Sequence, residues 1–356
     1  MDDEKFARMK AQYQSHILRK ILFIALCVIF VLIAIVVSIN IGAYEISFTD
    51  VYKTIIDHIL GVEFEPYSKE WYDDEIVWNT RMPRISFAIL AGIGLAISGA
   101  TMQSIMKNPL AEPYTTGVSS GAYFGVAISM VLGFTMLPVL SGAEAFIFAL
   151  VPVAVILIIL PRSNNSVATI ILIGTALSYM FNAFTTLILV STDADTLANV
   201  YRWQVGSFAN VHWDDVYVVA AAVIIGTIII YLLSNRLNIM MMGDQSAQSL
   251  GVNVKTLRLA CMVIMAIMVA AIVTFSGIIG FIGLICPHIV RLIIGSDNRF
   301  VIPAGCAFGA AFLLFADTLS KWLSGLDSVP VGAVCSLIGA PLFLMLLMTN
   351  RRQIWR

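Results

Sequence analysis

The side chains that most often carry catalysis or bind metals are scattered along this 356-residue chain. Its four histidines, His16, His58, His212 and His288, occupy four separate segments, and neither an H-E-x-x-H nor a G-x-S-x-G sequence is present. The five cysteines stand singly in apolar stretches without C-x-x-C spacing, which is typical of small core residues rather than metal ligands or disulfides. No G-x-x-x-x-G-K-[S/T] phosphate loop occurs. The sequence therefore predicts no enzyme, no metal site and no cofactor, and a net charge of −1 argues against a nucleic-acid partner.

Two arginines flank a methionine and a proline in Arg81-Met-Pro-Arg84, at the entrance to a long apolar segment. One interpretation is that these two basic side chains dock a partner. The alternative is that both side chains only anchor a helix end in the lipid headgroup region. The residues alone leave both interpretations of Arg81 and Arg84 open.

A short polar segment, Gly243-Asp-Gln-Ser-Ala-Gln-Ser-Leu-Gly-Val252, has the end signals of a very short helix. Asp244 is a favourable N-cap, and Gly251 suits the left-handed position that follows a helix. Because a helix of under two turns is unstable alone in water, it needs a surface to rest on, with Ala247 and Leu250 as its apolar contacts. That surface is the protein's own bundle, the lipid surface or a partner.

A proline-containing segment follows Gln103 and interrupts an apolar run. Asn108-Pro109 and Pro113 must break the helix there. Non-helical backbone at membrane depth is tolerated only when it is buried in protein or lines a cavity. We therefore expect the region from Gln103 through Asn108 and Pro109 to fold against a transport pathway.

A second polar connection, Arg162-Ser-Asn-Asn-Ser-Val-Ala168, separates two later apolar runs. Its last residues, Ser166, Val167 and Ala168, offer small groups at the end of a helix pair. Two interpretations fit this pattern: these residues form a gate, or the connection is a plain turn.

The elements that position these residues are membrane helices. Apolar residues make up 59% of the chain and charged residues 12%, whereas soluble domains carry about 25% charged residues. Residues 259–290 contain no charged side chain, counting the histidine as neutral, so this run holds more than one crossing of about 20 residues. Glycines at 277, 280 and 283 predict close helix packing, and glycines at 117, 121 and 125 follow one another at four-residue intervals. We expect ten crossings at about 20–42, 84–105, 115–136, 143–161, 168–190, 215–234, 257–275, 278–295, 301–319 and 330–349, with the boundary near 275–278 left open.

Ten crossings place both termini on one side, and the basic residues indicate which side that is. With cytoplasmic termini, 15 of the 21 basic residues fall in inner segments, as the positive-inside bias predicts. We expect a single transmembrane domain over residues 1–356. It has a cytoplasmic segment at 1–19, an extracytoplasmic loop at 41–83 and a cytoplasmic loop at 235–256.

Several stretches, taken in order, make the chain resemble the FecCD-type (BtuC-like) permeases of ABC importers for iron siderophores, haem or cobalamin. The resemblance spans residues 81–343. It rests on Arg81-Met-Pro-Arg84, Gly99-Ala-Thr-Met-Gln103, Asn108-Pro-Leu-Ala-Glu-Pro113, Gly117-Val-Ser-Ser-Gly-Ala122, Gly243-Asp with Ser249-Leu-Gly251, Gly280-Phe-Ile-Gly-Leu-Ile-Cys-Pro-His-Ile-Val-Arg291, Ala316-Asp-Thr-Leu319, and Pro330-Val-Gly with Gly339-Ala-Pro-Leu-Phe343.

The resemblance implies an all-α polytopic membrane protein, a type II ABC importer bundle of ten helices in the cell membrane. It also implies a second permease subunit, identical or homologous, two cytoplasmic ATP-binding subunits that hydrolyse ATP, and an extracytoplasmic substrate-binding protein. In this family the arginines matching Arg81 and Arg84 pair with carboxylates of the binding protein. Lys321 stands where many relatives have arginine, and it keeps the charge but loses the bidentate fork.

The resemblance further assigns the short segment of Gly243, Asp244, Ala247, Leu250 and Gly251 to the coupling helix that rests in a groove of the ATPase. Ferric siderophores are the expected cargo because they are the commonest in the family, with haem and cobalamin as alternatives. A different class of function, a self-powered secondary transporter or channel, stays open as a lower-ranked alternative. Its main candidate for ion coupling is Asp317, because ionisable residues inside spans are usually functional.

Overall fold

The computed structural model describes residues 2–133, 142–162, 167–324 and 329–349. Within these ranges all regular structure is helical. Each of the ten expected spans coincides with a helix: α1 (Asp2–Asn40), α4 (Met82–Met106), α5 (Val118–Leu132), α6 (Ala143–Ile159), α7 (Val167–Leu189), α9 (Trp213–Leu232), α12 (Val254–Ser276), α13 (Ile282–Ile294), α14 (Asn298–Ser324) and α15 (Val331–Thr349).

Seven helical segments in the described part of the chain are long and apolar enough to cross a membrane, and they contain α1, α4, α6, α7, α9, α12 and α14. The apolar helices α5, α13 and Val331–Leu346 of α15 are shorter. A hydrocarbon core of about 30 Å needs about 20 helical residues. The described part of the chain is therefore that of an all-helical membrane protein whose apolar helices differ in length.

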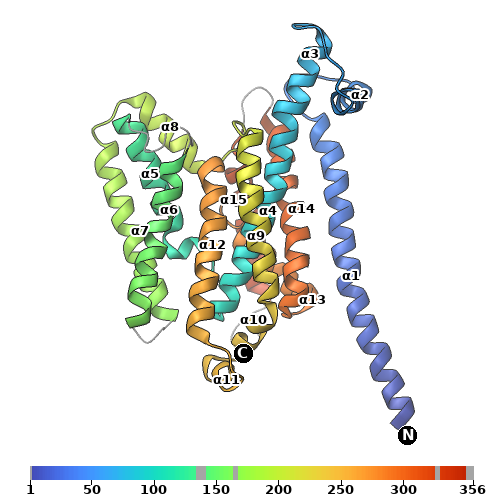
Figure 1. The fold of residues 1–356 in the computed structure, drawn as a ribbon, viewed down its shortest axis with the longest axis vertical. Coiled ribbons are helices and arrows are strands. Elements are labelled where there is room, and N and C mark those ends of the chain that lie inside the picture. Colours follow the sequence, from blue (N-terminus) through green and yellow to red (C-terminus); the bar gives the residue numbers. More distant parts are fainter. Residues whose placement is uncertain (1, 134–141, 163–166, 325–328, 350–356) are drawn as a thin grey trace.

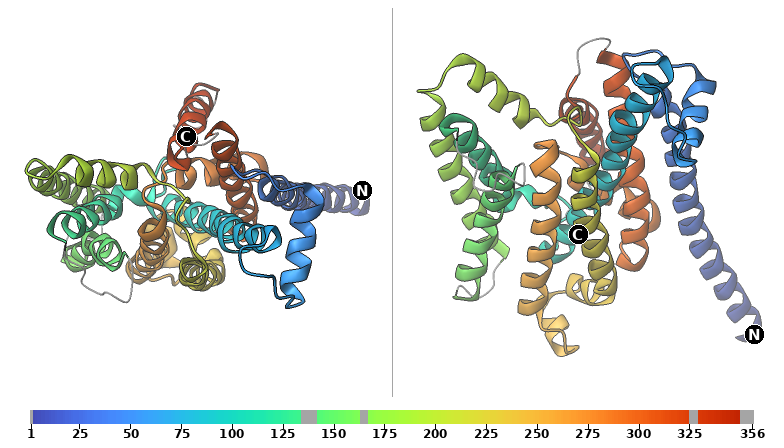
Figure 2. Two further views of the ribbon diagram at one scale, coloured as in Figure 1. Left: turned by 90° about the horizontal axis from the view of Figure 1, so that it is seen from above. Right: turned by 45° about the horizontal axis from the view of Figure 1, so that its top comes forward.

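Helix α4 lies at the centre of the larger of two helix groups, where it packs against α9, α12, α13 and α14 (Figure 1). The smaller group contains α5, α6 and α7, and α12 joins the groups because it packs against α4 as well as α5 and α6. Helix α1 lies outside the bundle and packs mainly against α14. Seen from above, α1 and the α5–α7 group occupy opposite edges (Figure 2).

Glycines let these helices approach closely, as the sequence predicts. A Cβ atom placed on Gly99 of α4 would lie 1.7 Å from the carbonyl oxygen of Gly283 on α13. Cβ atoms on Gly121 and Gly125 of α5 would lie 2.2 and 2.4 Å from carbonyl oxygens of α6. Gly280 is different, because no atom lies within 4 Å of the corresponding position. The predicted close packing is therefore confirmed at Gly283 but is wrong at Gly280, and the glycines of α5 let it approach α6 as closely.

Two helix interruptions meet inside the bundle. Helix α4 ends at Met106, and a non-helical stretch leads through the 3-10 turn η2 (Pro113–Thr116) into α5. Helix α12 ends at Ser276, and residues 277–281 are non-helical before α13 begins at Ile282. The Tyr114 hydroxyl of the first interruption donates a hydrogen bond to the Ile279 carbonyl of the second, at 3.1 Å. The expected start of the eighth span at 278 is therefore four residues too early, because residues 277–281 leave the helix.

The region between α1 and α4, expected as a loop over 41–83, is largely helical. It contains α2 (Phe48–Ile59), α3 (Lys69–Asp74) and the π-helix η1 (Glu75–Arg81), which continues directly into α4. The second span, expected from about residue 84, corresponds to α4, and the helical segment that contains it begins earlier, at Lys69.

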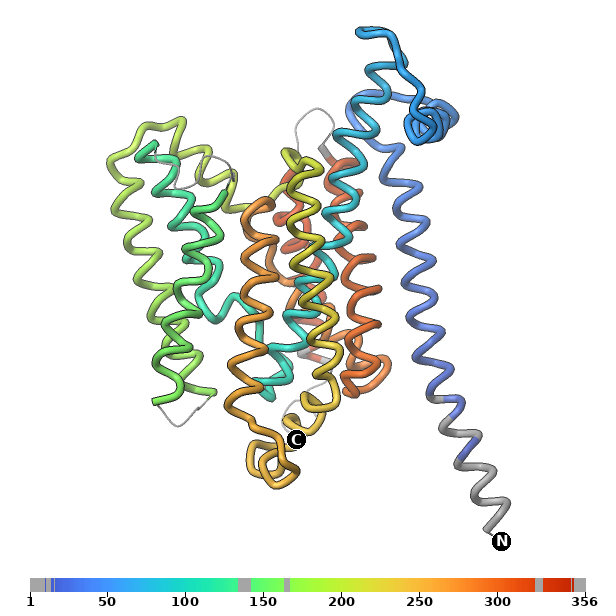
Figure 3. Tube along the Cα trace, viewed as in Figure 1, coloured from blue at the N-terminus to red at the C-terminus, as the bar shows by residue number. Residues whose placement is uncertain are grey.

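Short helices cover the two ends of the bundle. Helix α8 (Ala194–Val205) lies at the same end as α2 and α3, whereas α10 (Ser234–Met241) and α11 (Asp244–Ser249) lie at the opposite end (Figure 1). The 3-10 turn η3 (Leu160–Arg162) extends α6. The chain trace passes from α9 through α10 and α11 into α12 at one end, and from α7 through α8 into α9 at the other (Figure 3). We call these the α11 end and the α8 end.

Candidate functional site

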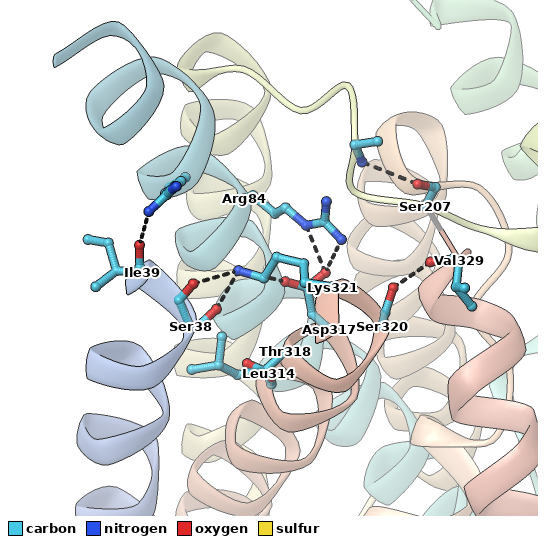
Figure 4. A network of polar contacts seen from close by, with 12 residues as sticks. Ser38, Ile39, Arg84, Ser207, Leu314, Asp317, Thr318, Ser320, Lys321 and Val329 are labelled. Carbon is cyan, nitrogen blue, oxygen red and sulfur yellow. Dashed lines mark hydrogen bonds and ion pairs between the residues drawn. The ribbon is translucent and has the colours of Figure 1, made fainter. Parts of the chain in front are cut away.

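The carboxylate of Asp317 organises the α8 end of α1, α4 and α14. Asp317 is fully buried on α14, and its Oδ1 accepts a hydrogen bond from Arg84 Nε at 2.9 Å and lies 2.8 Å from Arg84 Nη2. Lys321 lies one turn later, with Nζ 3.7 Å from Asp317 Oδ2, and it donates to the Ser38 hydroxyl at 2.6 Å (Figure 4). A buried charge must be paired and hydrogen-bonded. The two cations of α4 and α14 therefore share one carboxylate, and Lys321 ties both helices to α1.

Arg81 is also occupied within its own chain. Its guanidinium donates to the carbonyl oxygens of Ile39, at 2.7 Å, and Tyr44, at 2.5 Å. Only 5% of the residue is exposed, and a Cβ on Gly42 would come within 2.8 Å of Nη2. Arg81 thus fastens the end of α1 to the start of α4, which is not the environment of a lipid-headgroup anchor.

Arg81, Arg84 and Lys321 therefore lie at the same end of the bundle, around the end of α1 and Asp317. The side chains of Arg84 and Lys321 are 14% and 9% exposed. Arg84 bonds to α14 through Asp317, and Lys321 bonds to Ser38 of α1, so their first role is to hold these three helix ends together. Asp317, the candidate for ion coupling, is the shared acceptor of this network rather than an isolated carboxyl group.

Asp244 does not cap α11 as predicted. The N-cap position is Gly243, with φ of +118°, and Asp244 is the first helical residue. Its carboxylate instead accepts hydrogen bonds from Lys107 Nζ at 3.0 Å and from Arg258 Nη2 at 3.1 Å. The Arg258 side chain is fully buried. Burial opposes ionisation of Asp244, but the hydrogen bonds from Lys107 and Arg258 outweigh it and hold the pKa of Asp244 below its usual value.

We call Lys107, Asp244 and Arg258 the Asp244 clamp. Lys107 ends α4 in a left-handed conformation with φ of +52°, and Arg258 lies in the first turns of α12. One carboxylate on α11 therefore contacts two long helices at the α11 end of the bundle. A movement of α11 must displace α4 and α12 or break these bonds.

The predicted end of α11 is confirmed. Gly251 has φ of +80°, its N–H donates to the Gln248 carbonyl at 3.0 Å, and the Val252 N–H donates to the Ala247 carbonyl at 2.9 Å. This is the Schellman arrangement that ends a helix at a left-handed glycine. Of the two expected apolar contacts, Ala247 is fully buried in the protein's own core, whereas Leu250 is 61% exposed. Ala247 therefore packs α11 against the rest of the protein, and Leu250 faces outward.

The remaining candidate residues are not brought together. Gln103 is buried on α4, where its Nε2 donates to the Leu284 carbonyl of α13 at 3.1 Å. Asn108 Oδ1 accepts the Leu110 N–H at 2.9 Å in the turn after α4, and Pro109 is half-buried in the same turn. Gln103 therefore links two helices, and Asn108 shapes a turn.

The polar connection after α6 is only partly described. Ser166 lies outside the described residues, and Val167 and Ala168 form the first turn of α7. The hypothesis that these residues form a gate stays a prediction.

Sequence reasoning missed a polar stripe along α7. Thr175, Tyr179, Asn182 and Thr186 are exposed and follow one another at intervals of four, three and four residues, so they share one helix face. Asn182 and Thr186 line a hollow of about 440 Å³ at the α8 end. Polar groups are costly against lipid. The stripe therefore indicates a face of α7 that meets water or another protein, and its helical spacing is visible in the sequence.

Comparisons with known proteins agree with this architecture. Residues 29–349 match the FecCD transport family. The chain is 35% identical to the hemin transport system permease protein HmuU of Yersinia pestis, over 89% of this chain and 92% of that protein. It is 33% identical to the iron(3+)-hydroxamate import system permease protein FhuB of Bacillus subtilis, over 88% of this chain and 80% of that protein.

A solved structure described as an inward-facing conformation of a metal-chelate type ABC transporter has the same fold. It aligns with a TM-score of 0.79 at 29% identity, covering 92% of this chain and 98% of the other. The family match extends over most of the chain and includes α4, the Asp244 clamp and the network around Asp317. The chain therefore belongs to the FecCD transport family and is a permease subunit of an ABC importer in the cell membrane.

Proposed function

We propose that this chain is one of two permease subunits, identical or homologous, of a complete importer. Two cytoplasmic ATP-binding subunits hydrolyse ATP, and an extracytoplasmic substrate-binding protein delivers the cargo. Each permease crosses the membrane ten times with both termini in the cytoplasm. The support is the coincidence of ten expected spans with ten helices, together with the 15 basic residues that this orientation places inside. The α11 end is then cytoplasmic, and the α8 end is extracytoplasmic.

The observation that carries the proposal is that α11 is held firmly while apolar side chains next to it stay exposed. Six residues cannot form a stable helix alone, yet α11 is fixed by the Asp244 clamp, a buried Ala247 and the Gly251 stop. Leu250 and the nearby Met242, 69% exposed, remain uncovered at this end. A rigid helix that leaves apolar side chains uncovered is suited to resting in a groove of an ATPase, with Gly243 and Gly251 setting its two ends.

The proposed pathway runs between the two permease copies, along the α7 stripe. Facing a second copy across a water-filled space gives Thr175, Tyr179, Asn182 and Thr186 partners that lipid cannot supply. The interrupted backbone that contains Asn108 and Pro109 packs on the 277–281 interruption through Tyr114. Two helix interruptions that contact each other inside the bundle provide a place where helices can rearrange during transport.

Docking of the binding protein at the α8 end is part of the proposal, with Arg81, Arg84 and Lys321 as its basic groups. Its support is charge balance, because the described contacts pair both Arg84 and Lys321 with the single carboxylate of Asp317, while those of Arg81 go to backbone carbonyl oxygens. The excess positive charge attracts an acidic surface even though little of each side chain is exposed. Because these three side chains also bind α1 and α14, docking of the binding protein would act directly on the positions of these helices.

The proposed cargo is a ferric siderophore, with haem and cobalamin as alternatives. Among relatives, one permease is named for hemin and another for iron(3+)-hydroxamate, and these names support an iron chelate as the cargo. The alternative function is a self-powered transporter or channel. In that case the chain alone would transport cargo in liposomes without ATP.

The test of the ATPase contact compares two exposed leucines at opposite ends. Leu250→Glu places a charge on the proposed contact, and Leu60→Glu places the same charge at the α8 end, where Leu60 is 73% exposed. We expect Leu250→Glu to reduce the amount of copurified ATPase at least about tenfold, since a buried unpaired charge at an interface costs several kcal/mol. Leu60→Glu should leave it unchanged. Equal copurification in both variants, or transport by the lone chain without ATP, contradicts the proposal.

A further inference from the structure

A second hollow opens at the α8 end, between α8 and the ends of α12 and α15. Its volume of about 780 Å³ lies within the range of roughly 300–1,000 Å³ that small-molecule sites occupy. Asn199, Arg202 and Trp203 of α8 line one wall, and Ser207 and Asn210 of the following segment line another. None of the described residues that line it is acidic. The hollow therefore combines one cation, an indole ring and several neutral hydrogen-bonding groups.

Arg202 differs from the basic residues of the Asp317 network. Arg81, Arg84 and Lys321 are bonded to carbonyl, hydroxyl or carboxylate oxygens of their own chain. Arg202 is exposed, and within the described ranges its guanidinium makes no hydrogen bond or ion pair. Its five N–H donors are therefore available to a ligand.

The wall that carries Arg202 is held rigidly. The Ser207 N–H donates to the Ser276 carbonyl at the end of α12, at 2.8 Å, and the Gly332 N–H at the start of α15 donates to the Gly206 carbonyl, at 3.2 Å. A Cβ on Gly277 would lie 2.0 Å from the Trp203 carbonyl oxygen. Backbone contacts therefore pin the end of α8 to two long helices. A binding residue on such a support loses little conformational freedom when it takes a ligand.

The hollow is also next to the proposed pathway. Helix α8 contributes Asn199, Arg202 and Trp203 to this hollow and Tyr201 and Gln204 to the 440 Å³ hollow beside the α7 stripe. The two spaces thus lie on two faces of one helix. A ligand bound to Arg202 would be separated from the proposed pathway only by α8.

We propose that this hollow binds an ionised carboxylate of an organic iron chelate as it enters from outside. Arg202 forms a bidentate pair with the carboxylate, Trp203 offers its ring to the apolar part of the chelate, and Asn199 and Asn210 bind further oxygens. The inference rests on the proposed importer function and narrows its cargo to chelates with a free carboxylate.

The test measures binding of two carboxylated iron complexes, ferric citrate and haemin, to the permease with its ATPase in phosphatidylcholine nanodiscs. Haemin dimethyl ester is the control ligand, because it keeps the ring and removes the carboxylates. Arg202→Gln removes the charge, and Arg202→Lys keeps it without the fork. Lys53→Gln is the control variant, because Lys53 is another exposed cation of the α8 end and lies outside the hollow.

We expect Arg202→Gln to weaken binding of both carboxylated complexes about tenfold to a hundredfold, the range for a hydrogen bond to a charged group. Arg202→Lys should be intermediate, Lys53→Gln should bind like the wild type, and the ester should bind equally weakly to all variants. The inference is overturned if the wild type binds neither carboxylated complex, if Arg202→Gln binds them normally, or if wild type binds the ester as tightly as haemin. Copurified ATPase and its basal hydrolysis, measured in the same samples, report separately on the proposed function, because they depend on the α11 end.

Discussion

Asp244 and Arg258 form an ion pair, with Asp244 Oδ2 3.1 Å from Arg258 Nη2, across the turn between α11 and α12. The arginine side chain is fully buried, whereas 37% of the aspartate side chain is exposed. Lys107 approaches the same carboxylate from the end of α4. This arrangement converts a six-residue helix, which could not stand alone, into a fixed part of the bundle.

We predict that Asp244→Asn loosens α11 from α4 and α12, because Arg258 loses the carboxylate that neutralises it. Breaking a buried pair costs about 3–5 kcal/mol, and partial exposure of Asp244 reduces this to about 1–3 kcal/mol. Hydrogen exchange over 244–252 should accelerate, and transport per ATP hydrolysed should fall. Gln245→Ala, at an exposed position of the same helix, is the control. Unchanged exchange in Asp244→Asn would show that the clamp does not hold α11.

A multiple-mutant comparison separates docking by Arg84 and Lys321 from their structural role. Arg84→Gln leaves Asp317 with Lys321 alone, 3.7 Å away, and should destabilise the bundle by about 3 kcal/mol. Adding both Asp317→Asn and Lys321→Gln removes the two remaining buried charges together and should restore most of the thermal stability. If the two cations also dock the binding protein, affinity for that protein stays about tenfold lower in the restored triple variant, and the deficit shrinks at high salt. Full recovery of binding together with stability would show that Arg84 and Lys321 only hold the helix ends.

Acid should weaken the contacts that Asp297 makes with α10 and α14. Hydrogen bonds from Arg299 and Asn238 lower the pKa of Asp297 to about 2, against about 3.9 for an unfolded aspartate. A carboxyl group whose pKa is depressed in the folded state stabilises it above the unfolded value and loses that contribution as pH falls to the folded value. The free energy of unfolding should therefore drop between about pH 4 and pH 2, and Asp297→Asn should flatten that part of the profile. Asp195→Asn, at an exposed position without a described partner, should retain the wild-type slope.

Two glycine substitutions of the same size should have opposite outcomes. Gly99→Ala places a methyl group 1.7 Å from the Gly283 carbonyl oxygen, so α4 and α13 must separate, at a cost of at least about 1–3 kcal/mol. Gly280→Ala meets no atom within 4 Å and should be tolerated. Thermal unfolding in detergent measures both effects. Similar melting temperatures for the two variants would contradict the close packing of α4 on α13.

The sequence was sufficient for features that depend on neighbouring residues. An apolar run of about 20 residues is a local property, and each of the ten expected ranges coincides with a helix. The helix stop at Gly251 is also local, because a left-handed glycine satisfies the last carbonyl groups of the preceding turn. The polar stripe on α7 follows the same rule, since its spacing alone places its residues on one face.

Features that depend on distant charges were decided only by the tertiary structure. The local rule predicted Asp244 as an N-cap, but Lys107 and Arg258 attract the carboxylate more strongly than the backbone N–H groups of α11 do. Arg84 and Asp317 are 233 residues apart in the chain, and no local pattern joins them. A buried charge must find its partner wherever the packed helices place one. For this reason Arg81, Arg84 and Lys321 bond within their own chain. Arg202 is exposed and has no such need of a partner.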